Sequence, residues 1–522
     1  MKASSAPRTS RSAVFVFIGI LLSRLAGLVR QSLFAHYFGL SDAAGAFAAA
    51  IKIPNFLNNL FGEGALSASF IPVYASLVAR GEHKEADRVA GAVASILALA
   101  VSALVLLGVV GTPLFIDVIA PGFKGSTRDL TIVLVRILFP SVGLMVMSAW
   151  CLGVLNSHHR FLVSYTAPVV WNAAMIGTLV IFGREPSLPR LAEILAWGSV
   201  VGSFLMFAVQ LPIVIKLAPA LRLNLDTTSD HVRTVVRNFM PTFVTRGVVQ
   251  LSGYVDQFIA SFLGATAVAA MANAQTIAIL PVSLFGMSVS AAELPAMSGA
   301  FGVDPDSTAK LRNRLNSGLR QIAFFVIPSA VAFLTIGDVL ADALFLGGRF
   351  TPKDAVYVWA IMGGSGVGLL ASTLGRLYSS TYWALKDTKT PLRYALIRVG
   401  TTTVLGFFFA IPLPRLLGLD AMWGAAGLTA SAGIAGWIEM LMLRRTLNSR
   451  IGHTGLPADF VIKLWIAALA GAAAAWAVKL MLPPVITRLT AIAVIAPYGL
   501  VFFAMTFAFR IPEASTALRR WR

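Results

Sequence analysis

Apolar residues dominate this chain in runs of about 20 or more, and short polar stretches separate the runs. A helix that crosses the hydrocarbon core of a bilayer needs about 20 mostly apolar residues. The pattern therefore predicts an all-α polytopic membrane protein with about fourteen transmembrane helices. The predicted spans are 13–38, 43–79, 89–118, 128–155, 161–183, 191–216, 235–263, 266–299, 318–347, 354–384, 391–412, 418–443, 459–482 and 488–509.

Basic residues are concentrated in the short loops on one side of the predicted spans. An even number of spans puts both termini on one side, and the loops of that side hold most of the Lys and Arg, for example Arg80, Lys84 and Arg88. The positive-inside rule then predicts that both termini are cytoplasmic. Lys2 and Arg8 before the first apolar run imitate a signal peptide, but no small-residue cleavage site follows, so we expect an uncleaved span.

The composition excludes several other classes of protein. Hydrophobic residues make up 57% of the 522 residues and charged residues only 12%, whereas soluble proteins carry about 25%. The net charge of +19 is dispersed over helix ends and forms no compact patch for nucleic acid. The single cysteine, Cys151, excludes an internal disulfide. Walker, dinucleotide-binding, HExxH and CxxC motifs are absent, which favours a secondary transporter over an enzyme and predicts no cofactor or metal site.

The chain also repeats itself at a spacing of about six helices. Leu25-Ala26-Gly27-Leu28-Val29-Arg30-Gln31 recurs as Leu251-Ser252-Gly253-Tyr254-Val255-Asp256-Gln257, and Leu60-Phe61-Gly62 recurs as Leu284-Phe285-Gly286. A six-helix repeat keeps its orientation, so it predicts two parallel, pseudo-symmetric lobes with a site at their interface. We expect an N-terminal lobe at 1–222, a C-terminal lobe at 223–450 and two additional helices at 451–522.

Ionisable residues inside the apolar runs are the candidate functional groups. Each costs roughly 2.5–3.5 kcal/mol at the bilayer centre on insertion scales. The cations outnumber the anions, and a cavity lined in this way would suit a phosphate-bearing substrate because guanidinium groups match phosphate oxygens. The alternative is that these groups snorkel to the interface or pair with one another, as Lys52 could with Glu63. The set is Arg24, Arg30, Lys52, Glu63, Arg136, Arg246, Asp256 and Arg376.

Helix-breaking residues lie beside two of these charges. Pro54 follows Lys52 and precedes Asn55, and Gly62 and Gly64 flank Glu63. A proline in a helix frees a carbonyl and kinks the axis. The pattern is compatible with a gating hinge and equally with close helix packing at the glycines.

At these residues the chain resembles a known family, the MurJ/MviN proteins of the multidrug/oligosaccharidyl-lipid/polysaccharide exporter superfamily. Ordered matches run from the first predicted helix to the eleventh. They include Ser23-Arg24-Leu25-Ala26-Gly27-Leu28-Val29-Arg30, Lys52-Ile53-Pro54-Asn55, Phe61-Gly62-Glu63-Gly64-Ala65, Ala120-Pro121-Gly122-Phe123, Gly348-Arg349-Phe350-Thr351 and Trp383-Ala384-Leu385-Lys386-Asp387-Thr388-Lys389-Thr390-Pro391.

The resemblance implies two six-helix lobes plus two extra helices, which would form a groove for a lipid tail. It implies a flippase that moves lipid II, the undecaprenyl-pyrophosphate-linked peptidoglycan precursor, across the bacterial inner membrane by alternating access. Its implied partners are lipid II or a similar polyprenyl-pyrophosphate lipid, membrane lipids and peptidoglycan synthesis enzymes, without nucleic acid. The residues that match substrate-binding or functionally important positions are Ser23, Arg24, Arg30, Lys52, Asn55 and Glu63.

The resemblance also implies an ion-coupling site, for which this chain offers Asp256, Thr402 and Thr403. One carboxylate with hydroxyls is a weak set for Na⁺, so a proton on Asp256 or the membrane potential could drive transport instead. The chain departs from the family pattern at Gly45, where an acidic residue is usual, and at Asn58, where an arginine is common. Gln275-Thr276 stands where the family has an Asp-Arg pair.

Three alternatives remain open from the sequence. The same fold could carry another polyprenyl-pyrophosphate-linked oligosaccharide, which the departures from the family pattern allow. An exporter of drug-like cations would need acidic cavity residues, against the observed excess of Arg and Lys. A scaffold that recruits cell-wall enzymes would need long soluble loops or an added domain, and no predicted loop is long enough to fold.

Overall fold

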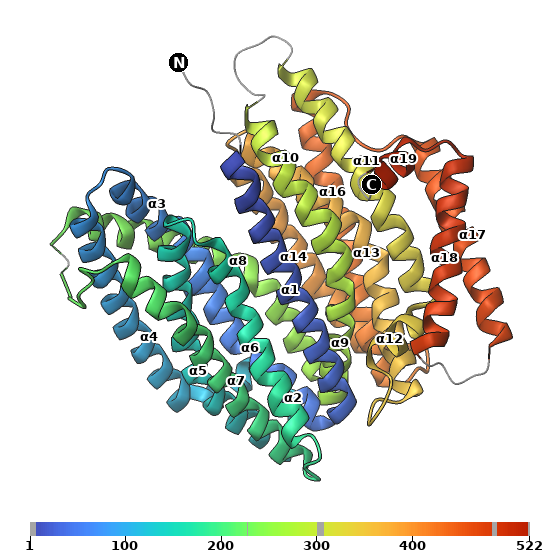
Figure 1. The fold of residues 1–522 in the computed structure, drawn as a ribbon. Coiled ribbons are helices and arrows are strands. Elements are labelled where there is room, and N and C mark those ends of the chain that lie inside the picture. Colours follow the sequence, from blue (N-terminus) through green and yellow to red (C-terminus); the bar gives the residue numbers. More distant parts are fainter. Residues whose placement is uncertain (1–6, 227, 300–306, 483–487, 520–522) are drawn as a thin grey trace. The chain divides into compact units, whose positions relative to one another are not determined.

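The computed structural model describes residues 7–226, 228–299, 307–482 and 488–519, and they are helical almost throughout (Figure 1). The chain forms two compact units, Met1–Ala269 and Ala270–Arg522. The first unit contains α1 (Pro7–Phe38), α2 (Asp42–Leu57), the π-helix η1 (Asn58–Gly64), α3 (Ala65–Ala79), α4 (His83–Ile119), α5 (Gly125–Ser157), α6 (Phe161–Phe182), α7 (Leu188–Leu217), α8 (Asp230–Ser261) and the start of α9 (Ala265–Pro281).

The second unit continues from α9 to the C-terminus. Its elements are the π-helix η2 (Val282–Met287), α10 (Ser288–Gly299), α11 (Ser307–Thr335), α12 (Gly337–Phe345), α13 (Pro352–Ala384), α14 (Lys389–Ala410), α15 (Pro412–Leu416), the 3-10 helix η3 (Ala421–Trp423), α16 (Gly424–Ile451), α17 (Ala458–Met481), α18 (Arg488–Ala508) and α19 (Pro512–Arg519).

Twelve helices of the described residues are long and apolar enough to span a membrane. They coincide with twelve of the predicted spans, and the all-helical polytopic prediction is confirmed. The two other predicted spans, 13–38 and 235–263, coincide with α1 and α8, which have 32 residues each but are not among the twelve. The count of fourteen therefore stays a prediction.

The predicted span 318–347 is wrong at its C-terminal end. The helix stops at Thr335, and the short α12 begins at Gly337 after Ile336 has left the helical conformation (φ −129°, ψ 25°). Both sides of the break are apolar, so a hydropathy pattern cannot show it. A Cβ on Gly337 would lie 2.4 Å from the Trp359 ring, so glycine permits this close contact with α13.

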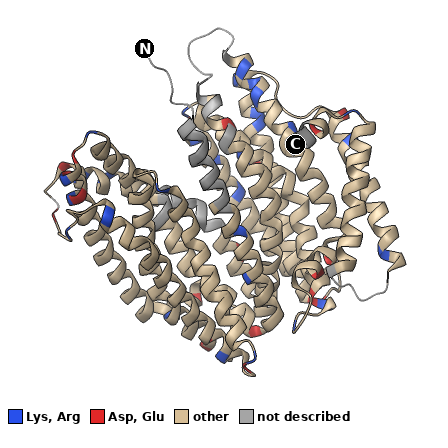
Figure 2. Ribbon diagram, viewed as in Figure 1, with Lys and Arg blue, Asp and Glu red and all other residues tan. Residues whose placement is uncertain are grey.

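The exposed side chains of α4 show why these helices need a bilayer. Leu106, Leu107 and Val110 are each about two-thirds exposed or more (66%, 67% and 71%). A continuous apolar face of this kind is unstable in water and matches lipid tails. Figure 2 shows the complement: long stretches of helix carry no charge, and charged residues gather near helix ends and in connecting loops.

Glycine lets helices approach closely within each unit. In the second unit α13 packs on α16, and a Cβ on Gly368 would lie 2.1 Å from the Cα of Gly433. In the first unit, a Cβ on Gly45 would lie 2.1 Å from the Ala265 carbonyl oxygen. Helices in lipid gain little from hydrophobic burial, so backbone contacts at small residues supply much of their packing energy. The departure from the family pattern at Gly45 thus has a structural reason, because a larger residue would not fit there.

The internal repeat appears as two π-helices. Leu60-Phe61-Gly62 lies in η1 and Leu284-Phe285-Gly286 lies in η2. A proline stands shortly before each segment, Pro54 within α2 and Pro281 at the end of α9. Proline removes a backbone donor and crowds the preceding turn, which loosens the hydrogen-bond ladder and favours a wider turn. The predicted lobe boundaries at 222 and 450 remain a prediction, since the compact units follow packing rather than repeat number.

The connection between α7 and α8 is held to the start of α4 by an ion pair and two hydrogen bonds. Arg88 forms an ion pair with Asp226, the Ala220 amide donates to Asp87 Oδ2 at 2.9 Å, and Ser229 Oγ donates to Glu85 at 3.2 Å. Hydrogen bonds from the Thr228 hydroxyl and amide, together with Arg88, lower the pKa of Asp226 to about 2.

The glycine contact predicts a sharp difference between two substitutions in one helix. Gly368→Val should lower the thermal unfolding temperature in detergent, because overpacking against backbone costs about 1–3 kcal/mol. Gly363→Val is the matched control, since a Cβ there meets nothing within 4 Å and the change in helix propensity is the same. Equal unfolding temperatures of the two variants would contradict the packing account.

The contacts between the α7–α8 connection and α4 predict that a variant without them is more sensitive to protease. Asp226→Asn should speed cleavage between residues 218 and 229, whereas Asp129→Asn, at an exposed side chain, should not. The pKa of Asp226 is depressed below its unfolded value of about 3.9, so its contribution is present above that value and is lost only as the pH falls toward about 2. Wild-type protection should therefore be equal at pH 8 and pH 5, measured with a protease active at both. A loss of protection by pH 5 would refute this assignment.

Candidate functional site

Arg24 lies near the middle of α1, about 21 Å from the helix end at Phe38. Its side chain is exposed and forms no hydrogen bond or ion pair with any described residue, while the neighbouring Ser23 is half-buried. The helix leans on α6, where a Cβ on Gly19 would lie 2.6 Å from Tyr165 Cβ. Arg24 thus points away from the side of α1 that packs on α6 and keeps its full set of donors.

Arg30 lies six residues, about 1.7 turns, further along α1 and rests on α6. Its guanidinium carbon is 4.8 Å from the centre of the Trp171 ring, and its Nη1 is 3.8 Å from Met175 Sδ. An aromatic face attracts a cation without neutralising it. No carboxylate of the described residues pairs with Arg30, so the positive charge stays available for an anion.

Lys52 connects α2 to α8. Its Nζ donates to Gln257 Oε1 at 2.6 Å, and the Tyr254 hydroxyl donates to the Lys52 carbonyl oxygen at 3.0 Å. Phe56 packs edge-on against Tyr254 with ring centres 4.8 Å apart. The hydrogen-bond partner of the Lys52 ammonium is therefore a neutral amide. The alternative pairing with Glu63 is not tested, because the Glu63 side chain lies outside the described part of the structure.

The predicted hinge residues cluster where α2 ends. Pro54 is buried, Asn55 is exposed, and Gly62 and Gly64 belong to the backbone of η1. Asn58 begins η1, is half-buried, and has a buried Oδ1 without a hydrogen-bond partner among the described residues. The backbone here is irregular, as the proline and glycines led us to expect. A hinge movement at the junction of α2 and η1 stays a prediction.

The predicted ion-coupling residues belong to different compact units. Asp256 lies in the first unit, where it interacts electrostatically with Lys52. Thr402 and Thr403 lie in α14 of the second unit: Thr402 is buried with its hydroxyl unpaired among the described residues, and Thr403 donates to the Val399 carbonyl at 2.8 Å. The described residues contain no group of three or more His, Cys, Asp or Glu that could hold a metal ion. The joint ion site remains a prediction.

The sequence reasoning missed two charged residues in the second unit. Arg398 of α14 pairs with Glu439 of α16 through Nη1 and Oε2 at 3.3 Å. Both lie inside apolar spans and could have been found by the rule that singled out Arg376.

The first unit therefore presents three cations within its helices, Arg24, Arg30 and Lys52. Neither arginine pairs with a carboxylate of the described residues, and Asp256 interacts electrostatically with Lys52. Guanidinium and ammonium groups in a water-poor setting bind oxyanions through short charge-assisted hydrogen bonds. Each of these cations can therefore bind a phosphate oxygen and would repel an organic cation.

Comparisons with known proteins show the family of this chain. The family model "Lipid II flippase MurJ" matches residues 34–507. The lipid II flippase MurJ of Burkholderia cenocepacia is 32% identical over 436 residues, covering 82% of each chain. The probable lipid II flippase MurJ of Vibrio cholerae is 29% identical, covering 84% of this chain and 83% of that protein.

Solved structures give the same result. A lipid II flippase MurJ in an inward closed conformation matches with a TM-score of 0.78 and 26% identity, covering 95% of this chain and 98% of that chain. An inward-facing MATE multidrug transporter of the MOP superfamily matches with a TM-score of 0.65 at 16% identity, covering 84% and 98%, which supports the fold alone. The chain therefore belongs to the lipid II flippase MurJ family and is a multi-pass protein of the bacterial inner membrane.

Proposed function

We propose that this protein flips lipid II from the cytoplasmic to the outer leaflet of the inner membrane by alternating access. The observation that carries the proposal is the placement of Arg24 and Arg30 on α1, inside a helix and without a neutralising carboxylate among the described residues. The family assignment supplies the cargo, and the two arginines supply a reason why this chain can hold its pyrophosphate.

The free-energy barrier to flipping a lipid comes mainly from its charged head group. A charged group is expensive to move through hydrocarbon, whereas the polyprenyl tail is apolar and can stay in the bilayer. Guanidinium groups that replace water around the phosphates lower that barrier, and their forked donors match phosphate oxygens. Lys52, held by Gln257, adds a third cation from a second helix. The favoured cargo is therefore an anionic head group on a long apolar chain.

The two π-helices are suited to the conformational change. Each lies after a proline and carries glycine, so its hydrogen-bond ladder is irregular where a regular helix would resist bending. Because η1 and η2 occupy corresponding places in the repeat, bending at both would let the lobes rock in a pseudo-symmetric way. In this proposal Pro54, Gly62 and Gly64 act as the first hinge.

The energy source, the orientation of the termini, the path of the lipid tail and the protein partners complete the proposal. The chain has no nucleotide-binding motif, so transport would be secondary and driven by Na⁺, protons or the membrane potential. Both termini would lie in the cytoplasm. The α17–α18 pair, which packs together and exposes large apolar side chains such as Leu469 and Ile492, would guide the lipid tail. Association with peptidoglycan synthesis enzymes is a further prediction.

A growth experiment tests the proposal. A bacterium deprived of its own lipid II flippase should be rescued by the wild-type chain and not by Arg24→Ala or Arg30→Ala. Removing one charged hydrogen-bonding partner costs about 1.5–3 kcal/mol, which slows the step roughly ten-fold or more.

The control is Arg190→Ala, which removes a cation at the exposed start of α7, where Arg190 pairs with Glu193. All variants are compared at equal membrane abundance. Rescue by well-expressed Arg24→Ala and Arg30→Ala at wild-type rates would remove the cationic site from the mechanism. Failure of well-expressed wild type would point to another polyprenyl-pyrophosphate cargo.

A further inference from the structure

Three charged side chains lie inside membrane-spanning helices of the second compact unit. They are Arg376 of α13, Arg398 of α14 and Glu439 of α16, and both α13 and α14 pack against α16. Arg398 Nη1 lies 3.3 Å from Glu439 Oε2, and Arg376 lies close enough to interact electrostatically with both. We call these three residues the second-unit triad.

All three residues of the triad lie more than two turns from the nearest helix end on their side. At 1.5 Å per residue, Arg376 is about 12 Å from the end of α13 at Ala384, and Arg398 is about 14 Å from the start of α14 at Lys389. Glu439 is about 18 Å from the end of α16 at Ile451. The chain therefore gathers three costly charges from three helices well inside the apolar part of one unit.

The triad is not balanced. It holds two cations and one anion, so it carries a net positive charge. Arg376 is exposed and its guanidinium forms no hydrogen bond or ion pair with any described residue, and Arg398 Nε is buried without a partner there. An unsatisfied buried donor costs about 1–3 kcal/mol. An external oxyanion would supply an acceptor to both guanidinium groups.

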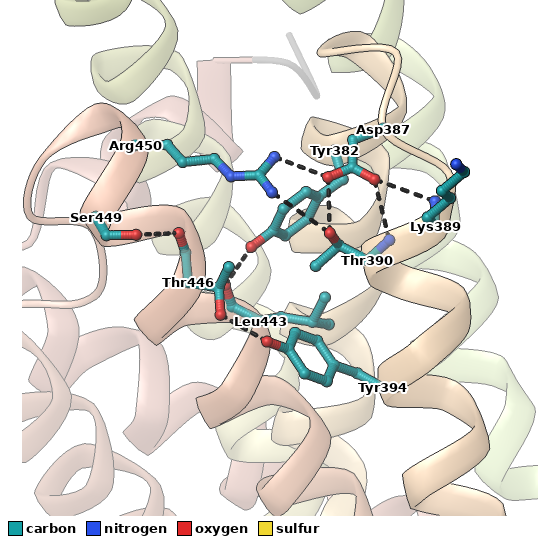
Figure 3. Close-up of polar contacts among 9 residues, drawn as sticks. All are labelled: Tyr382, Asp387, Lys389, Thr390, Tyr394, Leu443, Thr446, Ser449 and Arg450. Carbon is teal, nitrogen blue, oxygen red and sulfur yellow. Dashed lines mark hydrogen bonds and ion pairs between the residues drawn. The ribbon is translucent and has the colours of Figure 1, made fainter.

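The polar network at the adjoining helix ends provides a contrast (Figure 3). There Arg450 Nη1 pairs with Asp387 at 2.7 Å, and Tyr394 shares a hydrogen bond of 2.7 Å with Thr446. Hydrogen bonds from Thr390 and from Arg450 lower the pKa of Asp387 to about 2, so Arg450 and Asp387 form a charged pair whose charges balance. The pair fastens helix ends, and the Arg450 guanidinium is already engaged by Asp387 and Thr390, unlike that of Arg376.

A row of polar side chains along α14 connects the network at the helix ends with the second-unit triad. Thr390, Tyr394 and Arg398 recur at every fourth position of α14, which places them on one face of the helix. Thr446 and Glu439 lie on α16 opposite Tyr394 and Arg398. A head group at the helix ends would thus meet polar side chains on its way to the triad.

We propose that Arg376 and Arg398 form a second binding site for the phosphate group of a membrane lipid, and that Glu439 positions Arg398 and weakens the site enough for release. The inference rests on the proposed function for one of its two sources, the polyprenyl pyrophosphate of the precursor. The other source is an ordinary anionic phospholipid. Both present the same chemistry, a phosphate on an apolar chain.

Binding to the purified full-length protein in neutral detergent tests this site, with undecaprenyl pyrophosphate and cardiolipin as separate probes followed by native mass spectrometry. Lys52 stays in every variant, so its contribution is constant, and the other two cations of the first unit are removed in an Arg24→Ala/Arg30→Ala background. In it, Arg376→Gln should weaken binding of at least one probe about ten-fold, the loss of one charge-assisted contact worth about 1.4 kcal/mol. Lys353→Gln, an exposed cation at the other end of α13, is the matched control and should bind as before.

Glu439→Gln separates a binding role from a structural one. It frees the Arg398 fork and raises the net charge of the triad, so binding should become tighter. A purely structural ion pair predicts the opposite, a loss like that of Arg376→Gln. Because Arg398→Gln alone would leave Glu439 unpaired, Arg398→Gln/Glu439→Gln replaces it, and this neutral pair should bind several-fold more weakly.

The outcomes are distinct. Weakened undecaprenyl pyrophosphate binding identifies the precursor as the ligand, and weakened cardiolipin binding alone identifies a bilayer phospholipid; either upholds the site. Unchanged binding of both probes in Arg376→Gln and in the neutral pair overturns it. Weaker binding in Glu439→Gln overturns the role given to that carboxylate. These results do not depend on growth rescue, so failure of the proposed function is scored separately.

Discussion

Electrical charge inside a hydrocarbon layer is the constraint on which the rest of this structure depends. The bilayer cannot satisfy backbone groups, so the spans must be helices that bond their own carbonyls, and any exception needs local support. Lipid gives helices little hydrophobic reason to associate, so they pack through glycine contacts such as Gly368 on Gly433. Within that frame, each arginine at depth is a costly feature that needs either a partner or a use.

The two units deal with their charges in different ways. In the first unit, Arg30 rests on Trp171 and Lys52 donates to Gln257, so the direct contacts of both cations are with neutral groups, and Asp256 interacts electrostatically with Lys52. In the second unit, Arg398 is paired with Glu439 while Arg376 is not. Neutral support keeps a cation in position for an anion that arrives and leaves, which a tight carboxylate partner would oppose.

The sequence was sufficient for the fold class and for most helix positions, because length and apolarity are local properties. The predicted span 161–183 became α6 at Phe161–Phe182, whereas 318–347 was wrong because the break at Ile336 lies between apolar residues. For the candidate site, depth along α1 could be predicted, but the Trp171 and Gln257 partners could not, since they lie far away in sequence. Glu439 was overlooked although its mid-helix charge was visible.

The most direct measurement asks which leaflet the precursor occupies. In cells whose own flippase has been removed and that depend on this chain, an externally added, membrane-impermeant hydrolase reports the fraction of lipid-linked precursor exposed on the outer face. The account predicts that this fraction is high while the chain is present and falls as the chain is depleted, with precursor accumulating inside. A fraction that stays high after depletion would contradict it, because the precursor would then cross the membrane without this protein.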